Sequence, residues 1–280
     1  MKPIRTIVML VLAMAAIAAR AQSPYSSGDD FAKYAMKLRE SALLKIEPRV
    51  FVPTLGRTFV GGNYPWKTNI VTTIFWVGEQ PTQNNPVPNT ASSWDRYWVN
   101  SFGGFDNPDP GARRGYVPAN FVPQQNPFYC ALPYNDVTSG ATKPEARLVI
   151  PWFKNTFIKE GQSVCRDRWI AIRHGSKVCY AQWSDCGPWR TDYWQYVFGN
   201  QLPDPRLNNG AGLDVSPAVR DYLGLANKDV TDWKFVEFRD IPPGPWGRYG
   251  NNNTFVINAR RSSERVVERQ NSDGPTVLTK

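Results

Sequence analysis

The chain has few of the residues that usually hold a metal ion. Among its 280 residues there is one histidine, His174, and its four cysteines include no Cys-x-x-Cys pair. A structural zinc site takes four such ligands, commonly in closely spaced pairs, so no metal centre is expected. No organic cofactor is indicated, and no serine or cysteine arrangement typical of a nucleophilic enzyme is visible.

Long apolar runs and nucleic-acid motifs are also lacking. Beyond residue 21, no segment is both long and apolar enough to cross a membrane. The basic residues are spread along the chain and form no recognised binding motif, so nucleic acid is not an expected partner. We find no internal repeat.

Residues 1–21 have the pattern of a secretory leader, in which two cations and an apolar run precede a small-residue cleavage site. A membrane anchor is the alternative, but the run is shorter than a spanning helix requires. No cysteine near the cleavage point could carry a lipid. We therefore expect a secreted or periplasmic protein without a membrane anchor after leader removal. The elements of the leader are Lys2 and Arg5, the run from Ile7 to Ala19, and Ala19-Arg20-Ala21 before Gln22.

The formal net charge is basic before and after processing. It is +9 at pH 7 for the full chain, and removal of three leader cations (Lys2, Arg5 and Arg20) leaves +6. A basic exported protein suits an anionic partner such as a cell wall. The alternative is that the charge serves solubility alone.

The rest of the chain is mainly β in pattern. Residues 70–77 are β-branched and aromatic, as expected for a buried strand. Further strands are predicted at 126–136, 147–152 and 233–238, with a hairpin at 165–183 and a helix at 216–223. The predicted organisation is a leader (1–21), a helical and extended lead-in (22–68, with its helix at 29–46), a barrel domain (69–242) with a long insertion (78–127), and a flexible polar tail (243–280).

Two of these segments leave an alternative open. The insertion is rich in Asn, Pro, Gly and Ser, yet Trp94, Trp98 and Phe102 make it too apolar to be disordered throughout. Part of it is therefore expected to pack. For the tail, docking on the barrel is the alternative to disorder.

Four cysteines in an exported chain predict two disulfides. The hairpin at 165–183 pairs residues whose numbers sum to 351, a sum that Cys165 and Cys186 share. Cys179 is an odd number of positions from Cys186, so on a regular strand it points to the other face. A bend near residue 185 would overturn this pairing. The favoured disulfides are Cys165–Cys186 and Cys130–Cys179.

Two acids stand out in the middle of the chain, one at the end of a β-rich run and one just before the predicted helix. Asp185 lies in Lys177-Val-Cys-Tyr-Ala-Gln-Trp-Ser-Asp-Cys-Gly-Pro-Trp189, and Asp214 lies in Gly212-Leu-Asp-Val-Ser-Pro-Ala218, just before the helix. Together with Thr72-Thr-Ile-Phe-Trp76, Phe128-Tyr-Cys-Ala-Leu-Pro-Tyr134 and Val230-Thr-Asp-Trp-Lys-Phe-Val236, this order resembles the six-stranded double-psi β-barrel of expansins, barwin-like proteins and rare lipoprotein A. Such barrels host enzymes, wall-loosening proteins and binding modules, so the resemblance implies a fold before an activity.

The resemblance implies a polysaccharide groove beside Asp214. In related endoglucanases and lytic transglycosylases the matching aspartate is the general acid, which requires a raised pKa. Asp185 is expected to shape the groove, position Asp214 or contact sugar. Glu79 or Asp136 is the expected base of an inverting enzyme. The alternatives are structural: Asp214 as a helix cap, Asp185 in an Asx-turn, and Glu79 and Asp136 as solvated turn acids.

The chain departs from these families at the groove. Gly212 stands where they have the His of H-F-D, and Cys186 where rare lipoprotein A has the Arg of N-D-R-G-P. The upstream Glu and His that rare lipoprotein A uses have no counterpart, and His174 is expected on the surface of the hairpin turn. These departures favour binding over cleavage.

Aromatic residues near the two acids fit a carbohydrate partner, because sugar rings stack on Trp and Tyr. Core packing is the alternative for each of them. The predicted function is an expansin-like protein that binds a wall polysaccharide, either peptidoglycan or a cellulose-like polymer. A lytic transglycosylase or inverting glycosidase, and a secreted protein-binding scaffold, are the alternatives; the oligomeric state is left open. The expected sugar contacts are Trp183, Trp189, Tyr193 and Trp194.

Overall fold

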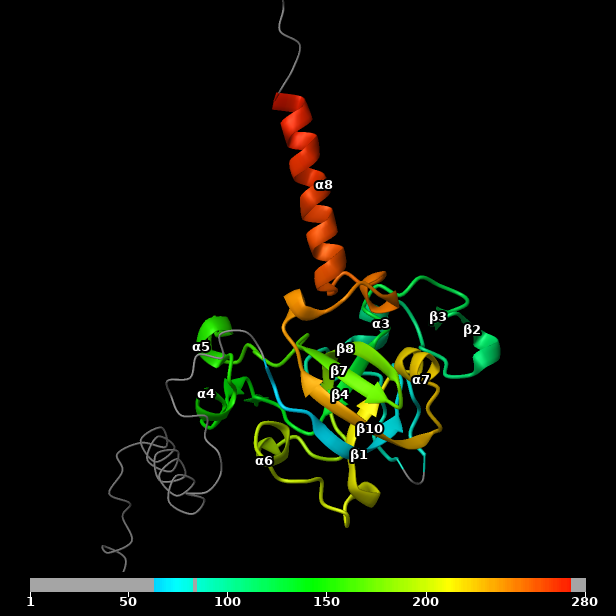
Figure 1. Cartoon of the computed structure of the whole chain (residues 1–280), viewed down its shortest axis with the longest axis vertical. Helices are drawn as coiled ribbons and strands as arrows, with labels where there is room; N and C mark the ends of the chain where they lie inside the picture. The colour runs from blue at the N-terminus through cyan, green and yellow to red at the C-terminus, as the bar shows by residue number, and fades with distance from the viewer. Residues whose placement is uncertain (1–62, 83–84, 273–280) are drawn as a thin grey trace, which may run out of the picture. The chain divides into compact units, whose positions relative to one another are not determined.

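The computed structural model describes residues 63–82 and 85–272 of the chain (Figure 1). All of them belong to one compact unit. The expected leader and the lead-in helix at 29–46 lie outside the described residues. None of the helices in the described part is long and apolar enough to cross a membrane.

A closed barrel of six strands dominates the described residues. Its strands are β1 (Lys67–Ile74), β4 (Tyr129–Leu132), β7 (Trp169–His174), β8 (Lys177–Cys186), β9 (Ala211–Val215) and β10 (Lys228–Phe235). Around the barrel they follow the order β1, β10, β7, β8, β4, β9. The pairs β1/β9 and β4/β8 are parallel, and the other neighbours are antiparallel. The prediction of a mainly β, six-stranded barrel is confirmed at this level.

The hairpin of β7 and β8 has the predicted register. Trp169 pairs with Gln182 and Arg173 with Val178, so facing residue numbers sum to 351. The regular pattern stops near the end of β8. Along the neighbouring strand β4, Cys130 pairs with Trp183 but the next residue pairs with Asp185, which leaves Ser184 as an extra residue in β8.

The predicted disulfides are not formed. All four cysteines lie in the described part of the chain, and all are free thiols. The predicted pairing assumed that the regular register of the hairpin continues as far as Cys165 and Cys186. Cys165, however, precedes β7, and the extra residue at Ser184 shifts the register of β8 before Cys186. The predicted partners still lie near each other. Burial is the main cause of the raised pKa of the Cys130 thiol, and the nearby Cys179 raises it further. Burial also raises the pKa of Cys165, and the nearby Cys186 is one of the smaller causes that raise it.

Two further segments differ from their predicted form. The strand expected at 147–152 is replaced by two short helices, α4 (Ala146–Val149) and α5 (Phe153–Thr156), separated by Pro151. Proline has no N–H for a strand ladder, which explains why this apolar run does not join the sheet. Conversely, β9 was not predicted as a strand, although it carries Asp214.

The tail predicted to be flexible from residue 243 is ordered at its start. Trp246, in the turn η4 (Pro245–Gly247), is buried against Tyr180 and Phe128, with ring centroids 4.9 and 6.2 Å apart. The helix α8 (Thr254–Ser272) follows, and its Phe255 ring packs 5.8 Å from that of Trp169. Packing of these aromatic rings stabilises a tail that is docked on the barrel, which was the alternative to a disordered tail.

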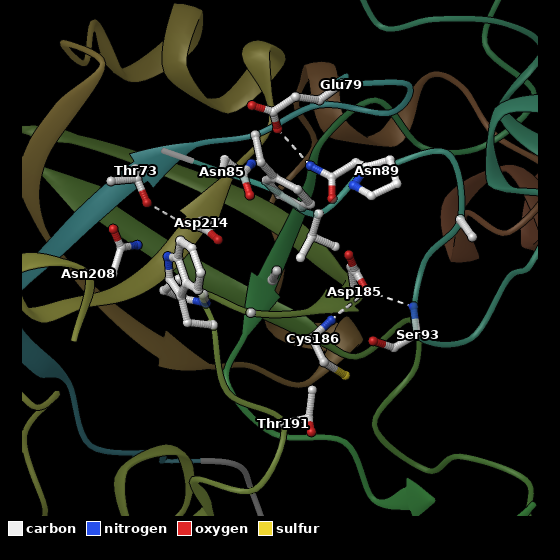
Figure 2. A pocket seen from close by; sticks show the side chains of 18 of the residues that line it. Thr73, Glu79, Asn85, Asn89, Ser93, Asp185, Cys186, Thr191, Asn208 and Asp214 are labelled. Carbon is white, nitrogen blue, oxygen red and sulfur yellow. Dashed lines mark hydrogen bonds between the residues drawn. The ribbon is translucent and has the colours of Figure 1, made fainter. Parts of the chain in front are cut away.

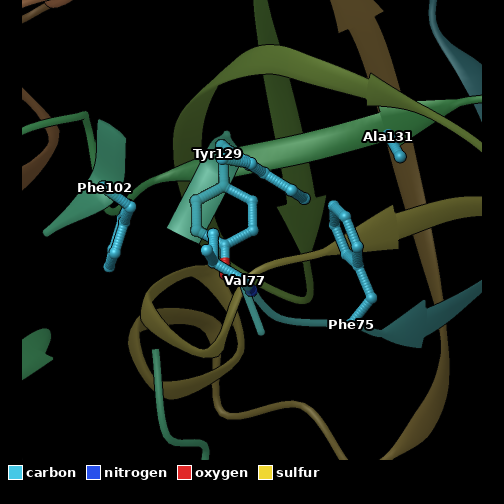
Figure 3. Close-up of a cluster of buried hydrophobic side chains, with 6 residues drawn as sticks. Phe75, Val77, Phe102, Tyr129 and Ala131 are labelled. Carbon is cyan, nitrogen blue, oxygen red and sulfur yellow. Dashed lines mark hydrogen bonds between the residues drawn. The ribbon is translucent and has the colours of Figure 1, made fainter. Parts of the chain in front are cut away.

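The insertion packs on the barrel through a buried cluster that includes two residues of the helix α3 (Trp98–Phe102) (Figure 3). Tyr129 lies between Phe102 and Phe75, and its hydroxyl accepts a hydrogen bond from the Val77 N–H (3.0 Å) and donates one to Asp106 (2.9 Å). Part of the insertion therefore packs as expected. The cluster consists of Phe75, Val77, Trp98, Phe102, Tyr129 and Ala131.

The other described elements are short and connect these parts. The helix α7 (Pro217–Leu223) confirms the predicted helix at 216–223 almost residue for residue. The remaining elements are η1 (Pro110–Ala112), β2 (Arg113–Arg114), β3 (Val117–Pro118), β5 (Val137–Thr138), β6 (Ala141–Thr142), α6 (Trp194–Val197), η2 (Asn208–Gly210) and η3 (Phe238–Asp240).

Candidate functional site

A cavity of about 680 Å³ lies between the barrel and the insertion (Figure 2). Residues of β1, β4, β8 and β9 line one side of it, and Asn85, residues 87–91 and Ser93 of the insertion line the other. Three carboxyl groups line this cavity: Glu79, Asp185 and Asp214. The fold therefore brings together three of the four acids singled out from the sequence.

The sheet sets the spacing of two of these acids. Ala131 of β4 pairs with Asp185 of β8 on one side and with Asp214 of β9 on the other. Neighbouring strands are about 4.8 Å apart, which puts the two acidic residues roughly 10 Å apart along the backbone ladder. Ala131 itself lines the cavity. Its small side chain leaves open space between the two carboxyl groups.

Asp214 is held by its neighbour in the parallel register. Thr73 of β1 pairs with Asp214, and its hydroxyl donates a hydrogen bond to Oδ1 (Figure 2). A methyl group at Gly187 would lie only 3.4 Å from Oδ2, so the lack of a side chain there leaves room beside this oxygen. Ser216, whose Oγ accepts a hydrogen bond from the Val219 N–H (3.3 Å), caps α7. Asp214 is thus not needed as the cap.

The surroundings of Asp214 favour its protonated form. Burial raises the pKa of this carboxyl to about 7, the charges of Asp185 and Glu79 act in the same direction, and the Thr73 hydrogen bond opposes them. A carboxyl group that is half protonated near neutral pH can give a proton to a bound ligand.

Asp185 is fixed by two backbone groups. Its Oδ1 accepts hydrogen bonds from the N–H groups of Ser93 and Cys186, both 2.7 Å long (Figure 2). Burial raises the pKa of Asp185 to about 6, and these hydrogen bonds limit the rise. Because Ser93 belongs to the insertion, the insertion directly positions an acid of the barrel.

Glu79 follows β1 at the turn where the insertion begins. The preceding Gly78 has a left-handed φ of 85°, and the Phe105 ring occupies the space that a side chain there would need. Asn89 donates a hydrogen bond to Oε2 of Glu79 (2.7 Å). Burial raises the pKa of Glu79, while hydrogen bonds from Asn85 and Asn89 lower it.

Asp136 lies elsewhere. Its carboxylate accepts hydrogen bonds from the Ser163 hydroxyl (2.6 Å) and the Val164 N–H (2.7 Å), and it is not among the residues that line the cavity. These contacts tie the end of the second predicted strand to the segment before β7, which is a structural role. Of the two bases proposed from the sequence, only Glu79 lines the cavity together with Asp214.

The four expected sugar-contacting aromatics separate into buried and accessible rings. Trp183 is 0% exposed, donates its indole N–H to the Asp185 carbonyl (2.8 Å) and packs in the core, and Trp194 is also buried. Trp189 is 56% exposed and lines the cavity. Tyr193 is half-buried beside Trp189 in a small adjoining depression. Trp183 and Trp194 therefore have no free ring face for a sugar.

Sequence reasoning missed the polar residues that the insertion and β1 contribute. Thr73, Asn85, Asn89 and Ser93 contact the three acids, as described above. The abundance of Asn and Ser in the insertion was the only signal available. Within the described ranges, no group of three His, Cys, Asp or Glu residues is arranged to hold a metal ion.

The stability of the protein is expected to fall as the pH rises from about 4 to about 7. Over this range the folded state keeps a proton on Asp214 that the unfolded chain, with an aspartate pKa of about 3.9, has released. The variant Asp214→Asn lacks this difference. The effect is measured by the melting temperatures of both proteins at pH 4.5 and 7.5. Between these two pH values the melting temperature of the wild type should fall more than that of the variant. An equal fall for both proteins would contradict the raised pKa of Asp214.

A comparison with models of known protein families gave no match to this chain. A search of curated proteins gave no match either.

Proposed function

We propose that this chain is an exported protein that binds a wall polysaccharide in the cavity beside Asp214. We further propose that its barrel is a double-psi β-barrel. The two parallel pairs, β1/β9 and β4/β8, within an otherwise antiparallel closed barrel support this topology. The order of the sequence motifs along the chain supports it as well.

One observation carries the proposal: an exposed indole and a pair of carboxyl groups line the same cavity. Sugars offer an apolar ring face for stacking and hydroxyl groups for hydrogen bonding, and Trp189 with Asp185 and Asp214 supplies partners for both. Trp189 also has a left-handed φ of 59°, which is uncommon for a bulky residue and is concentrated at binding sites.

The compartment follows from the leader pattern and the basic charge. An exported chain with a formal charge of +6 is attracted to an anionic wall, which would concentrate the protein on its polymer. This step rests on the sequence alone.

Cleavage of the bound glycan is the second candidate, and the raised pKa of Asp214 favours it. Asp214 would protonate the glycosidic oxygen as its bond to the sugar carbon breaks. In an inverting hydrolase, ionised Glu79 would take a proton from the attacking water. In a lytic transglycosylase a hydroxyl of the sugar itself would attack in place of water.

Co-sedimentation tests the binding proposal. The protein purified after export should pellet with insoluble peptidoglycan or cellulose, and Trp189→Ala should weaken pelleting about tenfold because the stacking face is lost. Tyr97→Ala, at an exposed aromatic residue outside the cavity, is the matched control and should pellet like the wild type. Failure to pellet with either polymer, or unchanged pelleting of Trp189→Ala, would reject a glycan site at this cavity and favour the scaffold alternative.

A further inference from the structure

The cavity has the opposite charge to the chain that contains it. The full chain carries a formal charge of +9. Apart from the thiol of Cys186, however, the ionisable groups that line the cavity are the carboxyl groups of Glu79, Asp185 and Asp214. Among the described residues, no lysine, arginine or histidine lines it.

Two basic residues that adjoin residues of the cavity lining, Lys143 and Arg190, are engaged with other partners. Lys143 donates a hydrogen bond to the Thr191 carbonyl (2.5 Å), and Arg190 pairs with Asp192 (3.0 Å) while its guanidinium lies over the Tyr193 ring. The buried Asp106 provides the contrast within the same protein, because it forms a direct ion pair with Arg113. The cavity carboxyl groups have no such pairing in the described part of the chain.

The arrangement of the carboxyl groups defines a place for a cation. Asp185 and Asp214 flank Ala131 on neighbouring strands, and both line the open space above its methyl group. Oδ1 of Asp214 is occupied by Thr73, whereas Oδ2 lies next to Gly187, where no side chain intervenes. A protonated amine above Ala131 could approach both acids, and a sugar hydroxyl could take the same position. A ligand carboxylate there would face charges of its own sign.

We propose that the cavity selects glycans by charge: it accepts sugar units that are neutral or carry an amine and rejects units that carry a carboxylate. The inference rests on the proposed glycan site and specifies its substrate class. The basic charge of the whole chain draws it to an anionic wall. The acidic cavity then binds only the neutral or amine-bearing stretches of the polymer. The positive charge of the chain thus brings the protein to the wall, and the negative charge of the cavity selects the sugar units that it binds.

A matched set of β-1,4-linked tetrasaccharides tests the selection by titration calorimetry. Cellotetraose and its 6-carboxylated form differ by a carboxylate on each unit, and tetra-N-acetylchitotetraose and its de-N-acetylated form differ by an amine on each unit. At pH 7.5, above the raised pKa values of both Asp185 and Asp214, the carboxylated form should bind roughly tenfold more weakly than cellotetraose. The amine form should bind at least as tightly as its N-acetylated parent.

Variants assign the selection to the cavity. Asp185→Asn should bring the carboxylated and neutral forms closer in affinity and weaken the amine form, and Glu79→Gln is a second variant in case the first does not fold. Trp189→Ala should weaken all four ligands alike. Equal affinity of the wild type for cellotetraose and its carboxylated form would overturn charge selection but leave the glycan site standing. If the wild type bound none of the four ligands, the proposed function would fail and the inference with it.

Discussion

Under the cleavage proposal, replacing Asp214 by asparagine is expected to reduce the release of soluble fragments from purified wall polysaccharide by about 10²–10⁴-fold. The carboxamide oxygen can still accept the Thr73 hydrogen bond, but the side chain has no acidic proton to give. Pelleting with the polymer should stay close to that of the wild type. Mass spectrometry of the supernatant measures the release, and the fragment ends separate hydrolysis from lytic transglycosylation.

Two companion variants sharpen this experiment. Asp240→Asn changes an exposed aspartate outside the cavity and should release fragments like the wild type. Gly187→Ala puts a methyl group 3.4 Å from Oδ2 of Asp214 and should give an intermediate loss. If the wild type pellets but releases no fragments, cleavage is rejected and binding without turnover remains. If Asp214→Asn releases fragments at the wild-type rate, another group is the acid.

Replacing Trp183 by alanine is expected to lower the free energy of unfolding by about 3–5 kcal/mol, whereas Trp189→Ala should change it by less than about 0.5 kcal/mol. Trp183 is fully buried, packs against Phe235 and Phe198, and donates a hydrogen bond to the Asp185 carbonyl. Trp189 is more than half exposed. Urea denaturation followed by circular dichroism measures both values.

The two tryptophans thus separate stability from binding. Trp189→Ala should fold normally yet lose affinity for the polymer, so its binding defect can be attributed to the missing ring. A loss of stability comparable to that of Trp183→Ala would mean that Trp189 is a packing residue. The stacking role would then lose its main support.

The local elements of the fold were the predictable ones. The register of β7 and β8 follows from a short turn between two apolar runs, and α7 follows from the Ser216 cap and Pro217 at its first turn. The strand β9 has only five residues, including a glycine and an aspartate, so its own sequence carries little strand signal. It forms because β1 and β4 flank it, and Thr73 is 141 positions away from Asp214.

The candidate site was predictable in part for the same reason. Asp185 and Glu79 each follow or end a recognisable run, Asp214 directly precedes the predicted helix, and the family resemblance indicated that these acids belong together. Asn89 and Ser93 lie in an insertion without periodicity, so nothing in the sequence shows which acids they contact. The roles of Trp183 and Trp189 depend on which face of β8 is buried and where that strand ends, and the extra residue at Ser184 lies between them.

The position of Ala131 between the two acids has a consequence for how the protein could adapt to different polymers. The separation of Asp185 and Asp214 is set by backbone pairing along β8, β4 and β9, so a ligand cannot change it without breaking the barrel. The facing wall belongs to an insertion, and insertions tolerate changes of length and sequence far better than strands do. New polymer preferences would therefore arise by exchanging residues 85–91, while Ser93, whose N–H holds Asp185, and the distance between the acids stay constant.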